Sequence, residues 1–109
     1  MKTNDISIAY VSWIGGGKLR PIYVISDSDN KVRFYKITSK YENKSPQIKS
    51  YYFKINSWKE AGLTKQSYID TITVGKIDKS KFNLRVIGRL TKEDAEALVM
   101  VLSDRDSIE

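Results

Sequence analysis

One arginine stands where a positive charge can meet an anion. Arg20 precedes Pro21, whose ring favours an extended or turn conformation for the arginine. The apolar and aromatic run at residues 22–25 is typical of a buried strand, and a glycine run at residues 15–17 lies just before Arg20. The sequence therefore predicts a guanidinium at the mouth of a core strand, beside a mobile loop. A guanidinium there can hold two phosphate oxygens at once.

The residue types that are missing narrow the chemistry further. The chain has 109 residues, with no cysteine and no histidine. Disulfides, thiolate metal sites and histidine acid–base catalysis are therefore excluded, and a zinc site would need a shell made only of carboxylates. We expect no metal and no cofactor.

Length and hydropathy indicate one domain, residues 1–109, without a membrane segment. No apolar run approaches the roughly 20 residues that a membrane span requires. The first predicted strand begins within a few residues of Met1, which is too early for a signal peptide. We therefore expect a cytoplasmic protein.

Charge is distributed unevenly along the chain. Residues 1–89 contain 17 Lys and Arg against 7 Asp and Glu, whereas residues 90–109 contain 2 against 6. A basic body of this kind suits a polyanion such as nucleic acid, or an acidic peptide. The alternative is that these lysines only keep a small protein in solution, which would produce the same excess of basic residues.

The chain pattern predicts six short strands and one terminal helix. Strands are expected at residues 6–11, 22–26, 32–38, 48–55, 68–74 and 84–89. Loops are expected at 12–19 and 39–46, a hairpin turn at 27–30, and one helical turn at 56–62 that Gly62 ends. Short strands with close turns and one helix predict a mainly β fold, a small and strongly bent antiparallel barrel.

The helix begins at Thr91, where Thr91 and Asp94 fit a capping box. The residues expected to pack on the sheet follow at helical spacing and are Ala95, Leu98, Val99 and Leu102.

In element order the chain resembles the MazF/PemK-type ribonuclease toxins of bacterial toxin–antitoxin pairs. Nearly the whole chain is covered, through short motifs that are each weak alone. They are Asn4-Asp5-Ile6, Arg20-Pro21 before an apolar strand, Ile37-Thr38-Ser39, Ser67-Tyr68-Ile69, Lys76-Ile77-Asp78-Lys79 and Ile87-Gly88-Arg89-Leu90-Thr91.

The resemblance implies an SH3-like barrel with a C-terminal helix. It also implies a homodimer that cuts single-stranded RNA without metal and a cognate acidic antitoxin that covers the RNA groove. Arg20 and Thr38 match the catalytic arginine and threonine of the family. Ser39, next to Thr38, could share its work.

Single-stranded RNA is held by cations along its phosphates and by aromatic rings under its bases. Lys18, Lys40 and Trp13 are expected to line the groove, and Lys44 and Tyr41 lie close by in sequence. Trp13 and Tyr41 could equally close the ends of the barrel.

One position departs from the family pattern. Gly75 falls where the family has a second arginine, and Lys76 is the nearest cation that could bind substrate instead. The general base is not assigned, although Asp70 is one option. A non-catalytic SH3-like module that binds nucleic acid or protein therefore stays open beside the ribonuclease, and a peptide-binding SH3-like domain ranks last.

Overall fold

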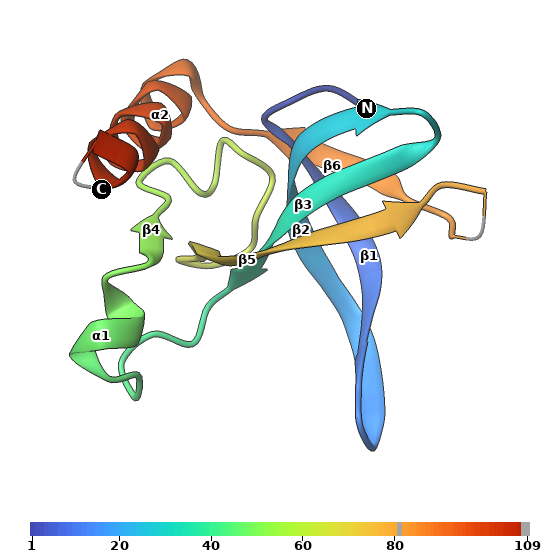
Figure 1. Cartoon of the computed structure of the whole chain (residues 1–109), viewed down its shortest axis with the longest axis horizontal. Helices are drawn as coiled ribbons and strands as arrows, with labels where there is room; N and C mark the ends of the chain where they lie inside the picture. The colour runs from blue at the N-terminus through green and yellow to red at the C-terminus, as the bar shows by residue number, and fades with distance from the viewer. Residues whose placement is uncertain (81, 108–109) are drawn as a thin grey trace.

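Six strands and two helices make up the computed structural model, which describes residues 1–80 and 82–107, without the side chains of 11–13 and 106–107. The elements, in chain order, are β1 (Asp5–Trp13), β2 (Gly16–Ser28), β3 (Lys31–Thr38), α1 (Pro46–Lys49), β4 (Tyr52–Lys54), β5 (Tyr68–Asp78), β6 (Arg85–Arg89) and α2 (Lys92–Ser107) (Figure 1). Neither helix within these residues is long and apolar enough to cross a membrane.

The strands form one antiparallel sheet in the order β4-β5-β3-β2-β1-β6. The mainly β fold with a C-terminal helix is confirmed, but the strand pairing does not close into a ring, because β4 and β6 are its two open edges. The segment between β4 and β5 bridges this opening. A Cβ atom added to Gly88 of β6 would collide with the carbonyl oxygen of Ala61, so the two backbones are in direct contact.

The loop expected at residues 12–19 is instead a hairpin. β1 and β2 pair as far as Trp13 and Gly16, and only Ile14 and Gly15 form the turn. Gly15 has φ +92°, which a glycine adopts without strain. The hairpin extends well away from the rest of the molecule (Figure 1). Arg20 therefore lies on a paired strand and not beside a mobile loop.

The strand expected at residues 48–55 is also shorter than its sequence indicates. Pro46–Lys49 forms the one-turn helix α1, and β4 covers only Tyr52–Lys54. Local chemistry explains the difference: the Ser45 hydroxyl accepts a hydrogen bond from Ile48 N at 3.2 Å, and Pro46 occupies the first helical turn. The expected turn ended by Gly62 is present, since Gly62 N and Leu63 N bond back to Lys59 O and Trp58 O.

Only one of the two hydrogen bonds of the expected capping box is present at the start of helix α2. Thr91 Oγ1 accepts a hydrogen bond from Asp94 N at 3.3 Å, as a capping box requires. The buried Asp94 carboxylate, however, accepts from Ser57 N at 2.8 Å and so ties the helix to the β4–β5 segment. Leu98 is buried and Ala95 and Leu102 pack against the core, whereas Val99 is exposed, contrary to expectation.

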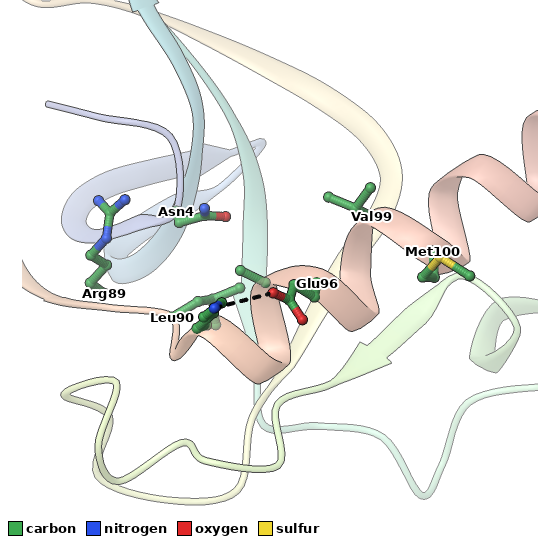
Figure 2. Close-up of a pocket in the computed structure, with 8 residues that line it drawn as sticks. Asn4, Arg89, Leu90, Glu96, Val99 and Met100 are labelled. Atoms are coloured by element: carbon green, nitrogen blue, oxygen red, sulfur yellow. Dashed lines mark ion pairs between the residues drawn. The ribbon is translucent and has the colours of Figure 1, made fainter.

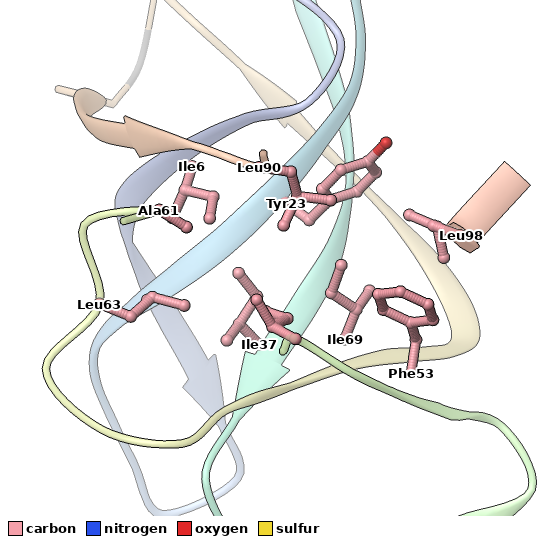
Figure 3. Packing of buried hydrophobic residues seen from close by; sticks show 10 residues of the cluster. Ile6, Tyr23, Ile37, Phe53, Ala61, Leu63, Ile69, Leu90 and Leu98 are labelled. Atoms are coloured by element: carbon pink, nitrogen blue, oxygen red, sulfur yellow. The ribbon is translucent and has the colours of Figure 1, made fainter. Parts of the chain in front are cut away.

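The main core lies on one face of the sheet, under α2 and the β4–β5 segment (Figure 3). It draws on five strands, this segment and α2, through Ile6, Tyr23, Ile37, Phe53, Ile55, Ala61, Leu63, Ile69, Leu90 and Leu98. A smaller cluster of Ala9, Ile22 and Phe34 is distinct from it. Successive side chains of a strand point to opposite faces of the sheet, so β1, β2 and β3 each contribute residues to both clusters.

We expect Gly88→Ala to lower the free energy of unfolding by roughly 1–3 kcal/mol, because backbone atoms of Ala61 occupy the space of the new methyl group. Chemical denaturation monitored by circular dichroism measures the change. Gly17→Ala is the matched control, since its methyl group would meet only the end of the exposed Tyr10 side chain. Equal stability of Gly88→Ala and wild type would contradict the bridging contact.

Candidate functional site

A cleft of about 190 Å³ brings together residues that are far apart in sequence. β2 contributes Lys18, Leu19, Arg20 and Pro21, and the end of β3 contributes Ile37 and Thr38, followed by Ser39. The segment before β5 completes the lining with Leu63, Thr64, Lys65 and Ser67. Four residues predicted from sequence, Lys18, Arg20, Thr38 and Ser39, therefore share one cleft.

Arg20 and Thr38 lie just beyond the paired part of β2 and β3. Ile22 lies opposite Lys36 in this antiparallel ladder. Continuing the same register by two residues on each strand sets Arg20 level with Thr38. Pro21 suits this place because its missing N–H is tolerated where a strand leaves regular pairing.

The Thr38 side chain is oriented by the backbone N–H of Lys40. Its Oγ1 accepts a hydrogen bond from Lys40 N at 3.1 Å. A threonine hydroxyl that accepts in this way can still donate its proton, so Thr38 can hydrogen-bond a phosphate oxygen in the cleft. The same bond turns the chain after β3, where residues 39–44 line a neighbouring cavity.

Sequence reasoning missed the wall that Thr64, Lys65 and Ser67 form. This segment is held by side-chain hydrogen bonds: Gln66 Nε2 donates to Ile55 O at 2.9 Å, and Ser67 Oγ donates to Lys65 O at 2.9 Å. The sequence of this segment does not predict that it lies near Thr38, because the position of the segment depends on its contact with β6. The only feature of this segment that suggests anion binding is Lys65, in a polar stretch.

Positive charges accumulate in this cleft and act on one another. The Arg20 guanidinium, followed by some loss of hydration and by the ammonium groups of Lys40 and Lys65, lowers the pKa of the exposed Lys18 amine from its ordinary value. Like charges disfavour the protonated form of a lysine, which is the direction seen here. The cleft is therefore electrostatically suited to a bound anion.

A second cavity, of about 430 Å³, adjoins the cleft through Ser39. It is lined by Ser39, Lys40, Tyr41, Glu42, Asn43 and Lys44, all from the loop after β3. Lys40 thus lies in this second cavity. The side chain of Trp13, also predicted to line the groove, is outside the described part of the structure.

Lys76 and Asp70 are not brought to the cleft. Lys76 pairs with Arg33, five residues along β3 from Thr38, which is roughly 15 Å at the usual rise of a strand. The Asp70 carboxylate accepts a hydrogen bond from Ile72 N at 3.0 Å. Gly75 lies opposite Phe34, and the Phe34 ring occupies the space where a side chain at residue 75 would begin.

A larger cavity, about 690 Å³, lies elsewhere, between the N-terminal segment, the end of β6 and helix α2 (Figure 2). Its charged side chains are paired, Arg89 with Asp5 at 2.8 Å and Lys92 with Glu96 at 4.0 Å. Apolar Val99 and Met100 form much of the rest. We therefore place the candidate chemistry in the smaller, cationic cleft.

Within residues 1–80 and 82–107, His, Cys, Asp and Glu form no group of three or more that could hold a metal ion.

Comparison with known proteins identifies the fold. Neither protein-family models nor curated proteins match the chain. Among solved structures, two crystal forms of MazE-MazF from Deinococcus radiodurans align over 99% of this chain and 94% of the other chain. Their TM-scores are 0.71 and 0.67, at 12% and 13% sequence identity. The chain therefore has a MazF-type fold.

The charge cluster has a measurable consequence at Lys18. We expect Arg20→Gln to raise the pKa of Lys18 towards its ordinary value, because the largest repulsion on the ammonium is removed. An NMR titration of the lysine side-chain resonances measures it. Arg33→Gln, which removes an exposed arginine of β3 well away from the cleft, should leave the Lys18 titration unchanged; an identical shift in both variants would argue against the cluster.

Proposed function

We propose that this chain is an endoribonuclease that cuts single-stranded RNA. One observation carries the proposal: Arg20 and Thr38 share a cleft with the lysines at 18 and 65. A hydroxyl and a guanidinium at one phosphate-sized site, surrounded by cations, suit the transfer of a phosphoryl group. The MazF-type fold supports the same reading.

The proposed reaction uses the RNA's own 2′ oxygen. The 2′ hydroxyl loses its proton to a base, and its oxygen forms a bond to the adjacent phosphorus. The bond from phosphorus to the 5′ oxygen of the next nucleotide breaks, and that oxygen takes a proton. The products are a 2′,3′-cyclic phosphate and a 5′ hydroxyl, and the step consumes neither water nor metal.

The cleft residues divide this work between them. Arg20 holds two phosphate oxygens and neutralises the charge that builds up on them in the transition state. Thr38 donates a hydrogen bond to the same phosphate or orients the 2′ hydroxyl, assisted by Ser39. Lys18, whose lowered pKa makes it a stronger acid than a free lysine, protonates the departing 5′ oxygen.

Lys65 supplies the second cation. The resemblance placed that role at the position of Gly75, where the Phe34 ring leaves no room for a side chain. Lys65 comes from the opposite wall of the cleft, close enough to Lys18 to lower its pKa. In this proposal Lys65 contacts the scissile phosphate together with Arg20.

In the cell we propose a sequence-selective toxin of the cytoplasm, acting as a homodimer. Its partner is a cognate antitoxin whose acidic segment lies over the basic cleft. The charge of the body, 17 basic against 7 acidic residues up to position 89, supports such a partner. The solved MazE-MazF structures with the same fold support a toxin–antitoxin setting.

A second function has one observation in its favour. The ring of Phe34 over Gly75 removes the position at which the family pattern has an arginine. A relative that kept the cationic cleft and lost efficient cleavage would bind single-stranded RNA, or an acidic protein, without cutting it. The two functions differ in one readout, the appearance of RNA fragments.

We expect wild-type protein to cut a long single-stranded RNA into discrete fragments in excess EDTA. Arg20→Ala should reduce the rate roughly 100- to 1000-fold, the usual cost of losing one transition-state donor. The matched control is Arg33→Ala, an arginine of the neighbouring strand outside the cleft. Gel analysis of fragments over time gives the rates.

Two results would contradict the proposal in different ways. Undiminished cleavage by Arg20→Ala would remove this residue from the site. Tight RNA binding by wild type without any fragments would support the non-catalytic module.

The position of the second cation can be tested by two lysine variants. Lys65→Gln should slow cleavage roughly 10- to 100-fold, since a hydrogen bond to a charged group contributes about 1.5–3 kcal/mol. Lys76→Gln, far along the sheet, should cut at a rate close to wild type. The reverse order of the two rates would return the second cation to Lys76.

A further inference from the structure

Three tyrosines gather beside the cleft. The rings of Tyr41 and Tyr68 are stacked, with centroids 4.3 Å apart and planes only 8° from parallel. Tyr52 lies against the same Tyr41 ring at 6.2 Å, tilted by 45°. All three are partly exposed, so the cluster is accessible from solvent and is not a closed part of the core.

The cluster is joined directly to the catalytic candidates. Tyr68 lies opposite Thr38 in the pairing of β3 with β5. Tyr41 follows Thr38 by three residues and lines the cavity that shares Ser39 with the cleft. A nucleotide next to a phosphate at Thr38 would therefore enter the space bounded by residues 39–44.

The outer face of Tyr41 already holds a cation. Lys49 Nζ lies 4.8 Å from the ring centroid, and since Tyr68 covers one face in parallel, the ammonium lies over the other. Lysine has a flexible stem and leaves such a contact at small cost, because an exposed cation–π pair contributes only about 0.5–1 kcal/mol. A planar base can replace it, and the displaced ammonium is then close to a phosphate.

The rest of this cavity has the groups that a base and its backbone require. Asn43 has an amide that both donates and accepts, and Glu42 has a carboxylate that accepts. Lys40 and Lys44 bring positive charge for the flanking phosphates. A ring face with mixed polar groups and cations around it is the usual composition of a single-strand subsite.

We propose that Tyr41, supported from beneath by Tyr68, is a stacking platform for an unpaired RNA base next to the phosphate that is cut. This inference rests on the proposed function and adds to it a base-binding subsite outside the catalytic cleft. Asn43 and Glu42 lie where they can contact the edge of that base and contribute to sequence preference. Tyr41 is a binding residue and takes no part in the proton transfers.

The test separates base stacking from any effect on charge or folding. Its probes are a fluorescent 12-nucleotide single-stranded RNA with 2′-O-methyl groups, which cannot be cut, and a phosphodiester chain of equal length without bases. Tyr41→Leu removes the ring, and Tyr41→Phe is the matched control that keeps it. Fluorescence anisotropy gives Kd for each protein on each probe.

We expect Tyr41→Leu to weaken binding of the RNA roughly 5- to 100-fold, the range for losing one base–aromatic stack. Its affinity for the chain without bases should equal that of wild type, and Tyr41→Phe should match wild type on both probes. The dependence of Kd on salt should not change, because the phosphate contacts remain.

Other outcomes overturn the inference. An equal loss on both probes would give Tyr41 a purely structural role, and no loss on either would remove it from the RNA site; in both cases cleavage by wild type would leave the proposed function intact. Failure of the wild-type protein to bind or cut single-stranded RNA would overturn the proposed function and the subsite together.

Discussion

The backbone contact between residues 61–62 and residues 87–88 is the constraint on which the rest of the structure depends. The strand pairing leaves β4 and β6 apart, and this contact bridges them without a ladder of hydrogen bonds. Glycine at 88 permits the approach, and burial of Ala61 and Leu63 in the core stabilises it. Asp94 fixes the same segment from the other side, through Ser57 N. The segment then continues into Leu63 and Lys65, so one wall of the cationic cleft follows directly from this contact.

Repulsion among the cations that line the cleft destabilises the protein when no anion is bound. The same repulsion lowers the pKa of Lys18. Two carboxylates of the basic body form ion pairs with other cations. Asp27 pairs with Lys79 at 2.8 Å and with the terminal ammonium at 2.7 Å, and Asp78 pairs with Lys31 at 3.5 Å. Hydrogen bonds from Lys79 and the terminal ammonium lower the pKa of the Asp27 carboxyl. Hydrogen bonds from Ser80, followed by the charge of Lys31, lower the pKa of the Asp78 carboxyl. At the cleft, a bound phosphate backbone or acidic peptide would relieve the repulsion between Lys18 and its neighbouring cations.

Sequence reasoning succeeded where the determinants are local. The turn at residues 27–30 was predicted from its Asp and Asn residues, and Asp29 and Asn30 indeed have the positive φ angles, 52° and 62°, of a two-residue hairpin turn. Arg20 and Thr38 were matched through a family resemblance and not through a local pattern, and both line one cleft in the structure. The errors fall where distant contacts decide. Glycines at 16 and 17 indicated a loop, yet pairing with β1 makes them a strand. The wall that carries Lys65 could not be predicted, because no local pattern reveals the approach to β6.

The position of Gly75 shows why matching residues one by one along a sequence can mislead about a site. A gap-free match to the family pattern leaves this position without a cation, which on its own argues against catalysis. In the structure the place is taken by the Phe34 ring, whose packing with Ala9 and Ile22 builds the smaller apolar cluster. A side chain at 75 would have to displace that ring, so packing explains the glycine without reference to function. Lys65 brings positive charge to the cleft from a different segment. A phosphate at the site requires positive charge nearby, and that charge can come from a segment other than the one that carries it in the family pattern.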